Sequence, residues 1–292
     1  MKGLLVVNAF VGSDKFMELF AMLQEAAGKQ EMELIRKTGD EMWVELAEQD
    51  YRLEGTYDFC LFWDKDVKLA RALELSGLRV FNSASAIAAC DDKAKTFLAL
   101  KLHKDICMPR TYISPKKFHR DGLVSERFLQ SIKEQLGFPC VVKECMGSFG
   151  QQVHLAHSEE ELCSIIQEIG ERDYMVQEYI QTSEGRDVRL QVVGKKVIAS
   201  MYRYNDADFR ANVTNGGSMR PIRPDEAWES MALAACEYLG LDFAGVDILY
   251  GEGEKPVLCE VNSNAHFKNL YACTGINAAD EIMMYIKEEI AR

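Results

Sequence analysis

The amino-acid sequence predicts an α/β (α+β) protein built from two or three subdomains. Its 292 residues are more than one hydrophobic core usually organises. Over residues 1–90, short apolar runs typical of buried strands alternate with stretches of helical spacing, which indicates a parallel sheet covered by helices. Farther along the chain, apolar runs follow one another across turn-rich segments, as the strands of antiparallel hairpins do.

The composition is that of an ordinary globular protein. Hydrophobic residues make up 48% and charged residues 27% of the chain, and no apolar run approaches the ~18 residues that a membrane span needs. The N-terminal apolar run is too short, and Asp14 follows it too soon, for a signal peptide. The net charge of −12 disfavours nucleic-acid and anionic-membrane binding but allows a local cationic pocket. We therefore expect a cytoplasmic enzyme with neither a nucleic-acid nor a membrane partner.

The nine cysteines are scattered along the chain, are odd in number and form no C-x-x-C pair. Most of them lie in apolar periodic segments, as buried free thiols do. The sequence therefore indicates neither a disulfide framework nor a zinc site.

The N-terminal segment predicts a small parallel α/β unit. We expect strands at residues 2–8, 59–63 and 79–81 and helices at residues 14–28 and 66–75. The carboxyl ends of such strands, near Asn8 to Asp14 and Asp64 to Lys65, are where folds of this kind place ligands. No G-x-G-x-x-G follows the first strand, so a dinucleotide site is not indicated.

The next segment places positive charge at the start of a helix. Residues 83–104 predict two short helices, and the second begins with Lys93, where the positive helix end already favours an anion. A strand at 110–113 and a helix at 125–135 follow. They are joined by a basic loop at 115–121, for which ordinary solvation is favoured over a partner-binding role.

A glycine segment follows a strand that ends in a lysine. The strand ending in Lys143 runs into Gly147-Ser148-Phe149-Gly150, and a second strand leaves that segment. Glycines let a backbone approach a ligand closely and offer N–H groups to phosphate oxygens, and Lys143 adds a positive charge. The segment is not a Walker A motif, because neither G-K-[ST] nor a helix follows it. A phosphate site and a plain hairpin are equally open at this point.

The following part of the chain predicts helices and strands around one long polar loop. We expect helices at residues 158–171 and 225–239, and strands at 174–180, 187–193 and 196–204. Ser158 and Glu161 fit a capping box at the start of the first helix. The loop at 205–220 holds Arg210 and Asn212. Long irregular loops in compact α/β domains are often functional, which makes this loop a candidate active-site element.

A hairpin predicted at residues 242–264 carries three polar side chains in otherwise apolar strands. If it turns about residues 253–254, Asp247 lies directly opposite Glu260, with roughly 4.5–5.5 Å between Cβ atoms. Glu260 and Asn262 share a face because the strand period is two. Two carboxylates and an amide oxygen suit Mg²⁺, which would also relieve the repulsion between like charges. An ordinary solvated hairpin face is the alternative.

These features, taken in order along the chain, make a nucleoside triphosphate site in which positioning and charge neutralisation supply the catalysis. With these features in this order, the sequence resembles the ATP-grasp superfamily, and within it the RimK-type amino-acid ligases. The resemblance covers residues 83–289 through the motifs VVKECMGSFGQQV, MVQEYI, GRDVRLQVVG, DFRAN followed by NGG, AGVDIL and LCEVN. It implies an ATP-grasp fold with an N-terminal preATP-grasp α/β domain. The expected domains are residues 1–88, residues 89–172 with a phosphate flap, and residues 173–292 with the Mg²⁺ site.

The resemblance also implies roles for individual residues. The ATP phosphates would be held by Lys93 and Lys143, beneath a mobile flap formed by Gly147, Ser148, Phe149 and Gly150. The adenine hinge and the ribose ligand would be Gln177, Glu178, Tyr179, Ile180 and Asp187. The catalytic cations would be Arg203 and Arg210, with Asn212 in the same loop, and the metal ligands would be Asp247, Glu260 and Asn262. The candidates for substrate contact are His266, Lys268 and Asn269.

The family mechanism fits these residues. A substrate carboxylate attacks the γ-phosphorus of ATP to give an acylphosphate and ADP, and an amine then displaces phosphate to form an amide. The resemblance implies ATP and Mg²⁺, with Mn²⁺ able to substitute. The partners would be an amino acid such as glutamate and a peptide, protein or small-molecule acceptor, handled by a homo-oligomer.

The substrate is left open by departures from the family pattern. After Asn262 the chain has SNAHFKN in place of an Ala-Ser-Pro-Gly-like turn. The FKN ending and the GSFG flap resemble ligases that act on an amino-group carrier protein in lysine and arginine biosynthesis, whereas DFRAN resembles the branch that modifies a ribosomal protein. Two other functions remain: an ATP-binding regulatory protein without ligase activity, and a kinase for a hydroxyl group. The complete set of metal ligands together with Arg210 favours the ligase.

Overall fold

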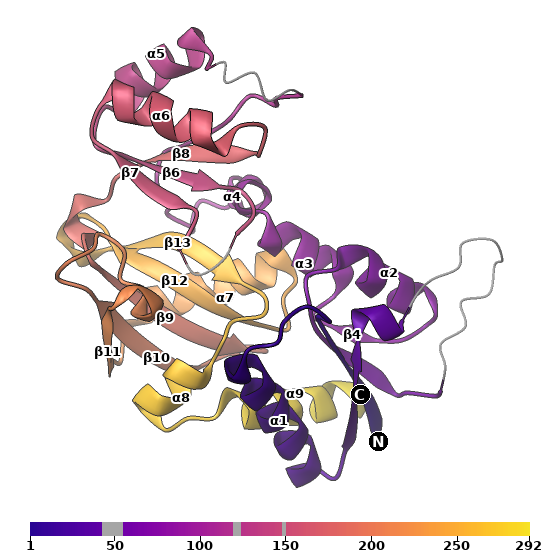
Figure 1. Ribbon diagram of the computed structural model, residues 1–292. Helices are drawn as coiled ribbons and strands as arrows, with labels where there is room; N and C mark the ends of the chain where they lie inside the picture. The colour runs from indigo at the N-terminus through magenta and orange to yellow at the C-terminus, as the bar shows by residue number, and fades with distance from the viewer. Residues whose placement is uncertain (43–54, 119–123, 148–149) are drawn as a thin grey trace.

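The structure is a computed structural model that describes residues 1–42, 55–118, 124–147 and 150–292. Its strands form three sheets, which follow one another along the chain. In Figure 1 the middle sheet lies in the upper lobe, the C-terminal sheet lies below it, and the N-terminal sheet lies at the lower right. Short 3₁₀ helices occur at η1 (Gly39–Glu41), η2 (Gln181–Ser183), η3 (Val213–Asn215) and η4 (Glu252–Glu254). None of the helices in these ranges is both long enough and apolar enough to cross a membrane.

The N-terminal sheet is parallel and has the order β2-β1-β3-β4. Its strands are β1 (Lys2–Val7), β2 (Glu33–Thr38), β3 (Phe59–Trp63) and β4 (Val80–Phe81), and its helices are α1 (Asp14–Lys29), α2 (Val67–Leu75) and α3 (Ala84–Asp91). The predicted strands and helices of this region are therefore confirmed. The Asp66 carboxylate accepts hydrogen bonds from the backbone N–H groups of Lys68 and Leu69, so it caps α2 rather than belonging to it.

The sequence analysis missed the edge strand β2. Its sequence ELIRKT has no apolar run, and Leu34 is its only buried residue. An edge strand that packs one side chain into the core lacks the hydrophobic pattern by which inner strands are found. β2 is held instead by pairing along its whole length with β1.

The middle sheet is antiparallel and has the order β5-β8-β6-β7. Its strands are β5 (Thr111–Ile113), β6 (Cys140–Glu144), β7 (Val153–Ala156) and β8 (Tyr174–Glu178), and its helices are α5 (Glu126–Gln135) and α6 (Glu159–Ile169). The helix α4 (Lys93–Leu100), which precedes this sheet in the chain, contacts α3 instead. Buried side chains of α5 and α6 form one cluster with β6 and β8. Because β8 pairs with β6, this sheet extends past residue 172, where the middle domain was expected to end.

The C-terminal sheet is antiparallel and has the order β11-β10-β9-β12-β13. Its strands are β9 (Arg186–Val193), β10 (Lys196–Tyr204), β11 (Ser218–Pro221), β12 (Phe243–Tyr250) and β13 (Pro256–Asn262), and the helices α7 (Glu226–Leu239) and α8 (Lys268–Thr274) contact it. α7 supplies the buried apolar partners of β9 and β12. The predicted hairpin is therefore the pair β12–β13.

The hairpin register confirms the predicted pairing of Asp247 with Glu260. Nearer the turn the register differs by one residue, because Ile248 pairs with Leu258. The strand β13 absorbs the difference as a bulge at Cys259. A bulge redirects the side chains that follow it, and bulges are frequent beside active sites.

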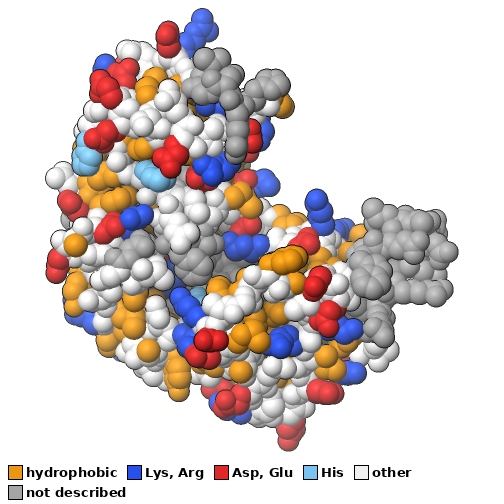
Figure 2. Space-filling view, viewed as in Figure 1, with side chains coloured by type: hydrophobic (Ala, Val, Ile, Leu, Met, Phe, Trp, Pro, Cys, Tyr) orange, Lys and Arg blue, Asp and Glu red, His pale blue; other side chains and the backbone are white. Residues whose placement is uncertain are grey.

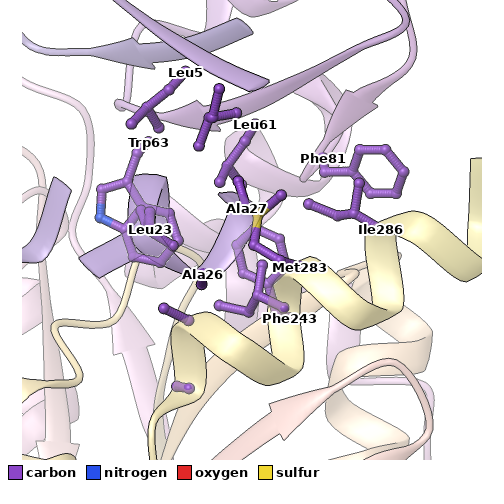
Figure 3. Packing of buried hydrophobic residues seen from close by; sticks show 14 of the residues in the cluster. Leu5, Leu23, Ala26, Ala27, Leu61, Trp63, Phe81, Phe243, Met283 and Ile286 are labelled. Carbon is purple, nitrogen blue, oxygen red and sulfur yellow. The ribbon is translucent and has the colours of Figure 1, made fainter. Parts of the chain in front are cut away.

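The last helix joins the end of the chain to its beginning. α9 (Ala278–Ile290) packs with α1 against the N-terminal sheet, where Met283 and Ile286 lie among Leu5, Leu61 and Phe81 (Figure 3). Trp63 of β3 also stacks on Phe243 of β12, with 5.6 Å between ring centroids. This shared core fixes the N-terminal sheet relative to the C-terminal sheet, and the fixed relation gives the space between them a defined shape.

Candidate active site

A cavity of about 210 Å³ lies where the three sheets meet. Figure 2 shows Lys and Arg side chains along the hollow between the lobe that carries the middle sheet and the rest of the molecule. Among the described lining residues, eight are cationic: Lys15, Lys65, Lys93, Lys143, Arg186, Arg189, Arg203 and Arg210. Five are acidic: Asp91, Glu178, Asp187, Asp247 and Glu260. In a chain of net charge −12, this local positive excess suits an anionic ligand.

The two predicted phosphate-binding lysines line the cavity from different elements. Lys93 is the first residue of α4, which Asp92 caps, and its Nζ lies 2.9 Å from the Gly147 carbonyl oxygen and 3.3 Å from Glu260 Oε1. Lys143 Nζ on β6 donates to Cys259 Sγ at 3.7 Å. Within the described part of the chain no carboxylate pairs with Lys143. The thiol sulfur is a weak hydrogen-bond acceptor, so the buried Lys143 ammonium can donate more favourably to a phosphate oxygen.

The glycine segment is described only at its two ends, because Ser148 and Phe149 lie outside the described residues. Gly147 has φ +146°, and a Cβ there would lie 2.4 Å from Gln152 Oε1, so the position requires glycine. The Gly150 carbonyl oxygen accepts a hydrogen bond of 2.7 Å from Arg210. Lys93 and Arg210 thus hold the two ends of the predicted flap.

The predicted adenine hinge lies where β8 ends. Gln177, Glu178, Tyr179 and Ile180 all line the cavity, beside the apolar side chains of Val141, Met201 and Leu249. The strand stops at Glu178, two residues earlier than predicted, so Tyr179 and Ile180 leave the sheet. Glu178 is anchored by Arg110, whose Nε donates at 2.7 Å. An apolar slot bordered by backbone that has left its sheet suits a flat heteroaromatic base.

Four charged side chains on three adjacent strands form a buried cluster at the floor of the cavity. Arg203 donates to both carboxylate oxygens of Asp187 at 2.7 and 2.6 Å. Arg189 donates to both oxygens of Asp247 at 2.6 Å, and Arg203 also lies 3.1 Å from Asp247. The positive charge that offsets the Asp247 carboxylate in this structure therefore comes from two arginines. The Asp187 carboxylate, the expected ribose ligand, is bound by Arg203.

These contacts shift the pKa values of the cluster. Burial alone would raise the pKa of Asp247, but the charges of Arg189 and Arg203 hold it below the ordinary value. Burial opposes the charge of Arg203, yet Asp187 and Asp247 outweigh this effect and raise its pKa. At Asp187 burial outweighs the charge of Arg203, and the pKa of this carboxyl is raised. The charged state is therefore favoured at Asp247 and Arg203, whereas burial opposes it at Asp187.

Arg189 is a functional candidate that the sequence analysis missed. It stands two residues after Asp187 on β9 and pairs in register with Asp247. The period of two on this strand was the signal that could have revealed it.

The second predicted cation, Arg210, lies in the loop above this cluster. Asp208 binds its guanidinium at 2.9 and 2.7 Å, and the pKa of Arg210 is raised by this hydrogen bonding. Asn212 lines the cavity beside it. Arg203 is thus held among carboxylates, whereas Arg210 reaches toward the glycine segment.

The predicted metal ligands lie together at one end of the hairpin. Glu260 and Asn262 line the cavity, and the Glu260 side chain is 30% exposed. Asn262 Nδ2 is buried and has no hydrogen-bond partner, so this N–H can donate to a bound acceptor such as a phosphate oxygen, whereas a metal would bind Oδ1. Among the described residues no three His, Cys, Asp or Glu side chains gather as a metal cluster. One carboxylate and one amide nevertheless fit Mg²⁺, which keeps phosphate and water as its other ligands.

The loop after β13 forms the end of the cavity that faces the N-terminal sheet. His266 and Asn269 line it, whereas Lys268 pairs with Glu18 of α1 and is not among the lining residues. The His266 ring stands edge-on to Phe16, and its Nε2 lies 3.3 Å from the Lys15 carbonyl oxygen. Burial lowers the pKa of His266 to about 4, so the ring is neutral near neutral pH.

Three further lining residues come from outside the predicted set. Lys15 and Phe16 begin α1, and Lys65 follows β3. Lys65 forms an ion pair with Asp91. Lys65, at the strand end where a ligand site is expected, therefore lines the cavity. Lys15 lies 251 positions before His266, whose ring contacts its carbonyl oxygen, and local sequence patterns do not reveal such a contact.

Comparisons with known proteins agree with this arrangement. A sequence profile of the RimK-like ATP-grasp domain matches residues 90–286. A probable alpha-L-glutamate ligase 2 of Shewanella amazonensis is 34% identical over 226 residues, 76% of this chain and 72% of that protein. Beta-citrylglutamate synthase B of Danio rerio is 33% identical over 227 residues, 76% of this chain and 54% of that protein.

A solved structure has the same fold. The ATP-grasp ligase PsnB, in complex with a minimal precursor, Mg and ADP, superposes with a TM-score of 0.71 at 15% sequence identity. The superposition covers 99% of this chain and 98% of that chain. This likeness confirms the predicted fold.

Proposed function

The chain belongs to the RimK-like ATP-grasp family and is an ATP-dependent carbon–nitrogen ligase, and from this premise we propose that it attaches an amino acid such as glutamate to a peptide, protein or small-molecule acceptor. The amide bond forms through an acylphosphate. The single observation that carries this proposal is the cavity itself, in which two buried lysines, an apolar slot and the Glu260–Asn262 pair line one continuous space.

Each step uses side chains that line this cavity. The slot at Tyr179 and Ile180 receives adenine, and Lys93 and Lys143 bind phosphate oxygens. Glu260 and Asn262 would hold Mg²⁺, with Asp247 beside them, and the bound metal would supply charge neutralisation at the phosphates. Mn²⁺ would substitute for it, since the same oxygen ligands suit both ions.

The transfer itself needs cations rather than an enzyme nucleophile. A substrate carboxylate attacks the γ-phosphorus, ADP leaves, and Arg210 offsets the charge that develops on the transferred group. Arg203 acts indirectly, since it binds Asp187 and Asp247 and holds both carboxyl groups in place. No covalent enzyme intermediate is involved, and the nine cysteines are all free thiols without a role in the reaction.

The substrate class is supported by the relatives and by the charge of the cavity. The relatives described above carry glutamate and citrylglutamate in their names, and both molecules are anions. The cationic lining at Lys15, Lys65 and Arg189 suits an anionic substrate. We further place the enzyme in the cytoplasm as a homo-oligomer, and size-exclusion chromatography with light scattering checks the assembly.

The test is a panel assay of ADP and phosphate release. Mg-ATP is offered with pairs of protein amino acids and citrate, and products are weighed by mass spectrometry. The proposal predicts release that depends on two substrates and a product equal to their sum less water. A phosphoester product would instead identify a kinase, and ATP binding without turnover on any pair would favour the regulatory alternative.

Two lysine variants control the assay. Lys143→Ala removes a buried ammonium from the cavity and is expected to lower ADP release by about 100-fold or more. Lys101→Ala removes an exposed lysine outside the cavity lining and is expected to leave ADP release unchanged. Equal activity of the two variants would contradict the assignment of the phosphate site.

A further inference from the structure

Asn264 carries a buried hydrogen-bond acceptor without a partner at the substrate end of the cavity. The residue lies two positions after Asn262 and lines the cavity. Its Nδ2 donates to the Asp64 carbonyl oxygen at 2.8 Å, which ties the hairpin loop to the end of β3. Its Oδ1 is buried and has no hydrogen-bond partner. Such an atom is rare, because desolvating an acceptor without a partner costs about 1–3 kcal/mol.

The orientation of this amide follows from its anchor. A backbone carbonyl oxygen can only accept, so the group that faces Asp64 must be the Nδ2 donor. The opposite side of the amide is therefore Oδ1, which can only accept a hydrogen bond. A ligand group that satisfies it must carry an N–H or O–H donor. Phosphates and carboxylates of the ionised substrates have no such donor.

The surroundings favour a neutral donor over a cation. Lys15 lines the same end of the cavity, and its pKa is lowered by burial and by the charges of Lys268 and Arg189. An amine bound in this neighbourhood experiences the same effects, which shift it toward its neutral, nucleophilic form. Asn264 Oδ1 is itself uncharged. It can orient an amine without the charge that would hold the amine protonated.

We propose that Asn264 binds the attacking amine of the second substrate through Oδ1 and aims its lone pair at the acylphosphate. This inference rests on the proposed ligase function and adds to it the residue that selects a nitrogen nucleophile. The amine nitrogen forms a bond to the acyl carbon, and the bond from that carbon to the phosphate oxygen breaks. The proton lost by the nitrogen leaves with the phosphate as HPO₄²⁻. Asn264 holds the N–H in place and takes up no proton.

The experiment separates formation of the acylphosphate from attack by the amine. Hydroxylamine is a small nucleophile that traps an acylphosphate as a hydroxamate without a dedicated amine site. The full-length protein is incubated with Mg-ATP and the carboxylate substrate that the panel assay identifies, and hydroxamate is measured with hydroxylamine present. Amide formation with the amine substrate of the same pair is measured by mass spectrometry without hydroxylamine. For Asn264→Leu we expect hydroxamate formation within about twofold of the unchanged protein and amide formation lowered at least tenfold, as for loss of one hydrogen bond of ~1.4 kcal/mol.

A matched control removes a different amide that contacts Asp64. Asn8 Nδ2 donates to the Asp64 carboxylate at 3.1 Å, but Asn8 is not among the residues that line the cavity. Asn8→Leu is expected to leave both products within about twofold, since its hydrogen bond supports the strand end and not the amine. Asn264→Ala, with a smaller side chain, repeats the test if Asn264→Leu fails to fold.

The outcomes are distinct. Hydroxamate and amide lowered together in both Asn264 variants would make Asn264 a purely structural residue and overturn the inference. The inference would also be overturned if the Asn264 variants formed amide as fast as Asn8→Leu does. Absence of hydroxamate from the unchanged protein would overturn the proposed function and, with it, the role of Asn264.

Discussion

Arg189 and Arg203 neutralise two carboxylates that would otherwise be buried alone. Asp187 and Asp247 lie on neighbouring strands beneath the cavity, and each accepts two hydrogen bonds from one guanidinium. The bidentate geometry suits arginine and not lysine. Removing one partner leaves a buried charge that the remaining groups offset only in part. Residue-scale predictions therefore concern charge and protonation.

Arg189→Met is expected to destabilise the protein by about 3 kcal/mol or more, because Asp247 keeps only its contact with Arg203. The measurement is the free energy of unfolding from denaturant titration. Arg71→Met provides the control, since the ion pair of Arg71 with Glu74 is exposed, and such pairs contribute about 1 kcal/mol at most. Equal stability of the two variants would contradict the role of Arg189 in the cluster.

His266 makes stability depend on pH. Its pKa is lowered from 6.5 to about 4 in the folded protein by burial and by Lys15, so the unfolded chain binds a proton first as the pH falls. The contribution of the neutral ring is fully present above pH 6.5 and is lost as the pH falls toward 4. When the pH is lowered from about 7 to about 5, the melting temperature of His266→Gln is therefore expected to fall less than that of the unchanged protein. An equal fall in melting temperature for the two proteins would refute this assignment.

At the scale of elements, the hairpin β12–β13 positions the proposed metal ligands. Next to the turn, Tyr250 pairs with Pro256. Farther from the turn, the bulge at Cys259 shifts the register by one residue, and as a result Asp247 pairs with Glu260. The bulge places Glu260 opposite Asp247 while Val257 and Leu258 stay buried. The hairpin thus combines an apolar inner face with a polar end at the cavity.

Glu260→Ala is expected to abolish turnover and leave the fold intact, because the carboxylate is partly exposed and its partner Lys93 keeps the hydrogen bond to the Gly147 carbonyl oxygen. The measurements are ADP release and the circular-dichroism melting temperature. Glu252→Ala, in the exposed turn of the same hairpin, is expected to retain full activity. Full ADP release by Glu260→Ala would sink the metal assignment.

The sequence predicted the elements that have strong local patterns. The pairing of Asp247 with Glu260 followed from two apolar runs around one turn, and Lys143 followed from its place before the glycine segment. Arg189 was missed although its period of two was visible. Asn264 and Lys15 could not be predicted, because their positions depend on how β3 and α1 meet the hairpin loop. Long-range packing of that kind leaves no trace in local periodicity.

At the scale of the whole molecule, the two ends of the chain share one core. α1 from the start and α9 from the end cover the same face of the N-terminal sheet (Figure 3). Lys29 of α1 also pairs with Asp280 of α9. The substrate end of the cavity lies between this N-terminal unit and the hairpin loop. The packing of α9 consequently supports the site from a distance.

Ile286→Ala is expected to lower the free energy of unfolding by about 2–5 kcal/mol, because it opens a cavity in a fully buried position. Ile276→Ala, at a position that is 37% exposed just before the same helix, is expected to cost about 0.5 kcal/mol or less. Denaturant unfolding of both variants measures the difference. Similar stabilities would show that α9 is not integral to the core.

The measurement that most directly tests the central claim follows oxygen from the substrate carboxylate. The substrate pair identified by the panel assay is used with its carboxylate labelled with ¹⁸O, and the released inorganic phosphate is analysed by mass spectrometry. Ligation through an acylphosphate transfers one labelled oxygen from the carboxylate to each phosphate. Phosphate free of label, formed together with the amide, would contradict a cavity that activates carboxylates with ATP.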